Sequence, residues 1–258
     1  MKKLLVFLFT LMSWQQAMAY RLTEDFSNGF YWSSFPVNFI VMDTDATRMQ
    51  MITDLAKNAV QEWETSITEG LWSITSQQGS PNSNRNIIRW STKFGKETGL
   101  SESTTLAVAI RYTKGPYVAR AEIIINGNHP MNSFQEQLNT VLVHELGHIL
   151  GLDHSDNRQA VMAPTLQVPY FGLHWDDQMG MDYTVTETKR RQVIGYVSPL
   201  ASSGSTTEES PLSCGTVDMS GGSSGGGSGG GMNPILSIGF GLLIALAALK
   251  SPFKSRAS

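Results

Sequence analysis

The stretch His-Glu-Leu-Gly-His-Ile-Leu-Gly-Leu-Asp-His, which begins at His144, constrains the fold more than any other part of this chain. On an α-helix, His144 and His148 lie one turn apart on the same face, so both imidazoles can bind a single zinc ion. Glu145 lies beside that face, where it can hold a zinc-bound water without being a ligand. Gly151 allows a sharp turn out of the helix, which can bring His154 back as the third ligand. The motif therefore predicts three histidine ligands and a fourth position open to water and substrate.

The distribution of histidines supports this interpretation. The chain has five histidines, and three of them belong to this motif, which argues against a chance arrangement on an ordinary amphipathic helix. The other two, His129 and His174, are predicted to be surface or packing residues, because no second zinc motif accompanies them.

The residues that follow the motif carry a resemblance to a known family. Met162 lies eight residues after His154, within Ala-Val-Met-Ala-Pro, and this combination resembles the metzincin zinc endopeptidases, in particular their matrixin branch. The resemblance implies that Met162 forms a hydrophobic floor under the ligands. It also implies that Pro164 gives structural support, and that the segment after it, including Thr165 and Leu166, forms the wall of the pocket for the substrate side chain after the cleaved bond.

The rest of the central region predicts an α+β fold, with a twisted mixed sheet packed on two long helices and the zinc site on the second. Alternating or apolar runs predict strands at 37–42, 86–90, 106–112 and 119–125, with a polar loop before the second. Four-residue spacing of apolar side chains predicts a first helix at 47–65, capped by Thr47. A capping box at 133–136 predicts the start of the second helix, with Phe134 on its buried side. A final helix is expected to begin near residues 176–177, with a solvated charged face at 187–191, and Trp32, Trp63, Trp72 and Trp90 are expected in the core.

The strand at 106–112 resembles the edge strand with which matrixins pair their extended substrates. The resemblance implies substrate contacts from Leu106, Ala107, Val108 and Ala109. An ordinary internal strand remains an equally acceptable interpretation of this segment.

The amino terminus predicts export. Two lysines, a short apolar run and Ala17-Met18-Ala19 are typical of a secretory signal peptide at 1–19, cleaved to leave Tyr20 as the first residue. The zinc-binding domain is then predicted at 20–195. Animal matrixins carry a propeptide whose cysteine blocks the zinc. No such cysteine lies between the predicted signal peptide and the predicted domain.

The carboxyl-terminal part predicts a tether and a membrane segment. Residues 196–231 are rich in serine and glycine and predict a flexible linker. The single cysteine, Cys214, lies in this linker, where a free thiol is more common than a metal ligand. Residues 232–258 contain an apolar helix followed by basic residues, which predicts insertion into a membrane. This tail resembles the bacterial GlyGly sorting signal, and a permanent inner-membrane anchor is the alternative.

The sequence predicts a secreted or surface-displayed zinc endopeptidase that acts on proteins or peptides. The tail's resemblance implies a Gram-negative host, a sorting protease and type II secretion as partners, and transient membrane contact. The resemblance also makes calcium binding plausible, but the sequence contains no dense acidic loop that would bind it. The net charge of −3 argues against binding to nucleic acid. A zinc-stabilised surface binding protein without turnover is the main alternative, and a metal hydrolase acting on a non-peptide bond is a second one.

Overall fold

The computed structural model describes residues 20–81, 84–165 and 171–201, together with the backbone of residues 210–218. The chain divides into two compact units, Met1–Gly221 and Gly222–Ser258, and all described residues belong to the first. The predicted signal peptide and the predicted carboxyl-terminal apolar helix lie outside the described residues.

The centre of the described fold is a mixed seven-stranded sheet. β3 pairs in parallel with β4 and β5, and β5 pairs in parallel with β7. β6 runs antiparallel to its two neighbours, so the strand order is β4-β3-β5-β7-β6-β9, with short β2 paired to β7. The strands are β2 (Tyr31–Trp32), β3 (Val37–Asp43), β4 (Trp72–Gln78), β5 (Ile87–Ser91), β6 (Thr105–Lys114), β7 (Tyr117–Asn126) and β9 (Ser210–Asp218).

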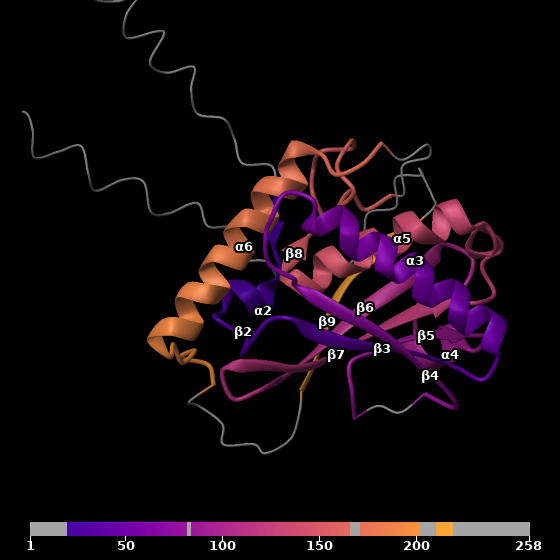
Figure 1. The fold of residues 1–258 in the computed structure, drawn as a ribbon, viewed down its shortest axis with the longest axis horizontal. Coiled ribbons are helices and arrows are strands. Elements are labelled where there is room, and N and C mark those ends of the chain that lie inside the picture. Colours follow the sequence, from indigo (N-terminus) through magenta and orange to yellow (C-terminus); the bar gives the residue numbers. More distant parts are fainter. Residues whose placement is uncertain (1–19, 82–83, 166–170, 202–209, 219–258) are drawn as a thin grey trace, which may run out of the picture. The chain divides into compact units, whose positions relative to one another are not determined.

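Two long helices lie on one side of this sheet, as Figure 1 shows. They are α3 (Ala46–Glu64) and α5 (Gln135–Leu150), and α6 (Trp175–Ile194) also packs against α5. A small antiparallel pair, β1 (Arg21–Leu22) and β8 (Leu152–Asp153), closes the end of α5. The structure confirms the predicted α+β fold, in which a mixed sheet packs on two long helices. The short helices are α2 (Glu24–Ser27), α4 (Phe94–Thr98) and the 3₁₀ helix η2 (Pro130–Ser133).

The first long helix follows its sequence pattern closely. Leu55, Ala59 and Trp63 are buried on the face that meets the core, as four-residue spacing requires. The Trp63 indole N–H also donates to the Val143 carbonyl at 2.8 Å, which joins α3 to α5. The cap is Asp45 rather than Thr47, because the Asp45 carboxylate accepts the first free backbone N–H groups of the helix.

The capping box predicted at 133–136 is wrong, although α5 begins at Gln135, two residues after the predicted start near Ser133. Ser133 belongs to η2, and its hydroxyl donates to the Pro130 carbonyl at 2.6 Å instead of capping α5. Phe134 is the N-cap residue of α5 without a side-chain cap, and it is exposed rather than buried. Because the Ser133 hydroxyl forms this local hydrogen bond with the backbone, it does not cap α5.

Two further predictions are corrected by the packing. Strand β4 occupies part of the predicted polar loop, because an edge strand that is largely exposed carries few of the apolar residues that mark a strand. Arg191 was expected in a solvated helix face, but it is buried and its guanidinium donates to the Phe26 carbonyl at 3.0 Å. Of the four tryptophans expected in the core, Trp90 is only partly buried.

The predicted flexible linker contains a strand. Residues 210–218 form β9, which pairs along β6 from Thr105 to Thr113. The expectation of a flexible tether is therefore wrong for this part of 196–231. β6 is an internal strand in this structure, and not the free edge that substrate pairing requires.

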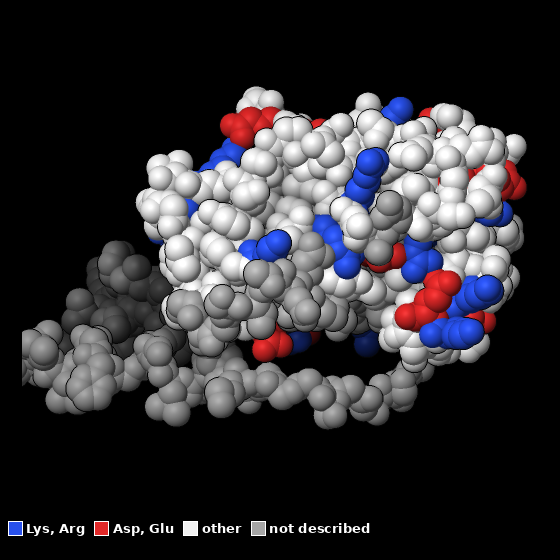
Figure 2. Space-filling view, turned by 90° about the horizontal axis from the view of Figure 1, so that it is seen from below, with Lys and Arg blue, Asp and Glu red and all other residues white. Residues whose placement is uncertain are grey.

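The described surface carries charges of both signs. Figure 2 shows a face on which the basic and acidic side chains of the described residues lie near one another. In the part of the chain that the structure describes, no helix combines the length and the apolar character needed to cross a bilayer.

Candidate metal centre

The end of helix α5 positions the predicted ligands. Gly151 adopts φ 109°, a left-handed conformation that ends the helix, and its carbonyl accepts the Thr23 N–H at 2.9 Å. A Cβ atom at Gly151 would lie 2.7 Å from the Phe26 ring, so glycine is required here for space as well as for conformation. The chain then enters β8 and reaches His154 on the other side of the site.

Backbone carbonyls orient the first two histidines. His144 Nδ1 lies 2.6 Å from the Val161 carbonyl oxygen, and His148 Nδ1 lies 2.7 Å from the Leu152 carbonyl oxygen. A carbonyl oxygen can only accept, so each Nδ1 carries the proton and each Nε2 presents a lone pair. This is the arrangement in which metal-binding histidines are usually held.

The three histidines converge on one point. The two Nε2 atoms of His144 and His148 lie 3.0 Å apart, and potential ligand atoms of His144, His148 and His154 all lie within 4.8 Å of one another. Zn–N distances of about 2.0–2.1 Å at tetrahedral angles place ligand nitrogens about 3.3 Å apart. Since two facing lone pairs repel without a cation between them, the donor set fits a zinc ion.

Burial keeps the two helix histidines neutral. Removal from water lowers the pKa of His144 to about 3, with the neighbouring His154 adding to the effect and the Val161 carbonyl opposing it. The pKa of His148 is also lowered, chiefly by burial and then by His144 and His154. At neutral pH both rings are therefore unprotonated and able to bind a metal without first losing a proton.

Met162 packs directly against the helix that carries the ligands. It is 2% exposed, and a Cβ atom at Gly147 would lie 2.3 Å from its sulfur and 2.9 Å from the Trp63 ring. Gly147, which falls between the two helix histidines, therefore makes the room for Met162. The sequence interpretation missed this role of Gly147, although the glycine stands inside the motif.

Asp177 holds the turn that orients His144. Its carboxylate accepts the Val161 N–H at 2.9 Å, the Met162 N–H at 3.1 Å and the His174 N–H at 2.8 Å. Burial raises the pKa of Asp177, and these three backbone donors counteract the rise. The peptide whose Met162 N–H donates to Asp177 also contains the Val161 carbonyl that His144 contacts.

The remaining histidines have packing roles, as predicted. His174 caps α6 by accepting the Asp176 N–H at 3.2 Å, and it forms a capping box with Asp177. His129 is buried and accepts the Met131 N–H at 3.3 Å.

Asp176 and Asp177 were expected only as favourable charges at a helix start. The spacing His174-x-x-Asp177 was the available signal for the capping box.

The structure also places the other predicted site residues. Glu145 is fully buried on α5, immediately after His144. Pro164 is exposed and Thr165 is partly buried, whereas Leu166 lies outside the described residues. The predicted substrate-contacting residues Leu106, Ala107, Val108 and Ala109 are all buried on β6, whose outer side is paired with β9.

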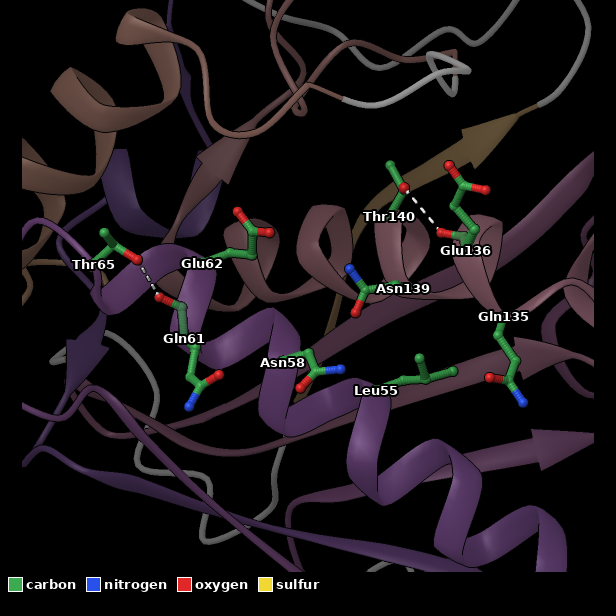
Figure 3. Close-up of a pocket in the computed structure, with 9 residues that line it drawn as sticks. All are labelled: Leu55, Asn58, Gln61, Glu62, Thr65, Gln135, Glu136, Asn139 and Thr140. Carbon is green, nitrogen blue, oxygen red and sulfur yellow. Dashed lines mark hydrogen bonds between the residues drawn. The ribbon is translucent and has the colours of Figure 1, made fainter.

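A separate groove lies between the two long helices. Its volume is about 590 Å³, and Figure 3 shows the side chains of α3 and α5 that line it, among them Asn58, Glu62, Glu136 and Asn139. None of the three converging histidines lines this groove, so it is distinct from the metal centre.

A helix with two histidines one turn apart, a third histidine beyond a left-handed glycine, and a methionine beneath them defines the metzincin class of zinc-binding proteins. The matrixin family model matches residues 32–184, which include all three histidines, Glu145 and Met162. The chain therefore belongs to the matrixin family, whose members use zinc. A search of curated proteins finds no match to the sequence.

Proposed function

We propose that this chain is a zinc-dependent endopeptidase that hydrolyses peptide bonds in proteins or peptides. The observation that carries the proposal is the convergence of His144, His148 and His154, with two of the rings held in the metal-binding tautomer by backbone carbonyls. Membership of the matrixin family supports the same activity.

In this proposal His144, His148 and His154 hold the zinc ion. Bound zinc supplies Lewis acidity, which lowers the pKa of water and polarises the scissile carbonyl. Glu145 accepts a proton from the attacking water on its carboxylate and delivers it to the nitrogen of the leaving amine. The protein around Glu145 excludes bulk water, since the residue is fully buried, and this strengthens its interaction with the reacting groups.

A metal-removal experiment tests the proposed activity. The purified chain is expected to cleave casein, to lose at least 95% of that activity (roughly a twentyfold fall) after treatment with a chelator, and to regain it with added zinc. Retention of full activity after the metal content has fallen to zero contradicts the proposal. Zinc binding without any cleavage of unstructured substrates favours instead the surface binding protein considered from the sequence.

We also propose that the enzyme is exported and displayed on or released from a Gram-negative surface. The signal-peptide pattern at 1–19 and the glycine-rich, apolar and basic tail at 221–258 support this localisation. Mass spectrometry of the extracellular protein should find Tyr20 at the amino terminus and a carboxyl terminus near the glycine run. Recovery of the intact chain only from the inner membrane contradicts the sorting proposal and favours a permanent anchor.

A further inference from the structure

Strand β9 occupies the outer edge of β6. The pairing is antiparallel and extends from Thr105 opposite Asp218 to Thr113 opposite Ser210. Without β9, β6 would end the sheet and present a row of free N–H and C=O groups. An extended polypeptide that added to this edge would need the same backbone groups that β9 uses.

The covered edge lies against the helix that carries the metal centre. Leu106 and Ala107 of β6 pack with Val141 of α5 in one buried cluster, and β9 itself contacts α5. A polypeptide that reaches the histidines along β6 must therefore take the place of β9.

The sequence of β9 makes it a weak strand. Pro211 has no N–H group to donate, and Gly215 has low strand propensity. The pairing with β6 is irregular at two places, between Thr105 and Ala107 and between Val108 and Ile110. The segment also lies beyond residues 32–184, which the matrixin model covers. These features are those of a strand that can leave the sheet without unfolding the domain.

We propose that residues 210–218 are an intramolecular blocking strand, which occupies the substrate-binding edge and keeps the full chain in a latent state. This proposal rests on the proposed peptidase function. The block is competitive, because β9 and an extended substrate use the same groups of β6. Displacement of β9, by a partner or by cleavage on either side of it, activates the enzyme.

Attachment to the domain gives the blocking strand its advantage. A segment tethered by a short connection has an effective concentration in the millimolar range. Free peptide at micromolar concentration cannot displace it if the two pair equally well with β6. We therefore expect that loss of β9 pairing raises kcat/KM for an unstructured peptide at least tenfold.

Proline substitutions in the full chain test the proposal. In an antiparallel pair alternate residues direct their N–H groups toward the partner. Pro211 is accommodated as a non-donor, so the N–H of Leu212 points to β6 and that of Ser213 points away. Leu212→Pro should accelerate peptide cleavage at least tenfold and speed hydrogen exchange in β6. The matched control, Ser213→Pro, should leave both near the wild-type values.

Three outcomes overturn the blocking strand. One is faster exchange in β6 of Leu212→Pro with no gain in cleavage rate. Another is equal activation by Leu212→Pro and Ser213→Pro. The third is full activation by Cys214→Ser with unchanged exchange, which would assign latency to the thiol and not to strand pairing.

A binding experiment separates this proposal from the proposed activity. In full-length Glu145→Gln, an added unstructured casein peptide should speed exchange in residues 210–218 while β6 stays protected. This replacement of one strand by another does not require turnover, so it is expected even if the chain hydrolyses nothing. Unchanged exchange in 210–218 at saturating peptide overturns the blocking strand and leaves the peptidase proposal standing.

Discussion

Replacing Glu145 with glutamine is expected to lower kcat/KM for casein by about 10³-fold while zinc remains bound. Glutamine has nearly the same size and shape, but its amide cannot accept the proton of the attacking water. General acid–base groups contribute about 10²–10⁴-fold to catalysis, and this glutamate is proposed to act both as base and as acid. The zinc content, measured by metal analysis, should stay at one ion per chain.

The same variant is not expected to lose stability. Glu145 is fully buried, and a buried carboxylate carries a desolvation cost that a neutral amide largely avoids. Thermal unfolding should therefore occur at the wild-type temperature or above it. Glu136→Gln is the matched control, since Glu136 lies exposed on the same helix, and its activity should not change. Glu145→Gln with more than a tenth of wild-type activity contradicts the assigned role.

Replacing Asp177 with alanine is expected to lower the free energy of unfolding by about 3–5 kcal/mol. The change leaves the backbone N–H groups of Val161, Met162 and His174 without their acceptor. An unsatisfied buried donor costs about 1–3 kcal/mol, and the lost side chain also leaves a cavity. Chemical denaturation at neutral pH measures this loss.

Zinc affinity should fall together with stability in Asp177→Ala. The turn held by Asp177 contains the Val161 carbonyl that orients His144, and loss of an outer partner of this kind weakens metal binding about 10–100-fold. Competition with a chromophoric chelator measures the affinity. Asp182→Ala is the matched control, because Asp182 is exposed on the same helix. If both variants unfold at the same denaturant concentration, the turn does not depend on Asp177.

The successful predictions from sequence concern neighbours along the chain. The spacing of His144 and His148 and the buried face of α3 depend on helical periodicity alone. Four strands of the sheet were predicted from apolar runs before the first helix and between the two helices. The left-handed Gly151 is also a local property, because glycine alone adopts such angles without strain.

The failures concern competition between local and distant contacts. β4 was missed because an exposed edge strand needs few apolar residues, and the cap of α5 was misplaced because Ser133 bonds to the nearer Pro130 carbonyl. Arg191 was assigned to solvent because its charge pattern is that of a surface helix. Its burial depends on the Phe26 carbonyl, which lies at the other end of the domain sequence.

The sequence by itself determined that three histidines and a glutamate would gather at the end of one helix, since that requires only a helical repeat and one turn. The tertiary structure decided which nitrogen of His144 is left free to bind a metal, because the partner of the other nitrogen, the Val161 carbonyl, belongs to a turn held by Asp177. It also decided that β6 is covered. The pairing of β9 with β6 joins residues more than ninety positions apart. It is made by backbone hydrogen bonds, which nearly all residue types can form, so the side-chain pattern of the sequence gives little indication of it.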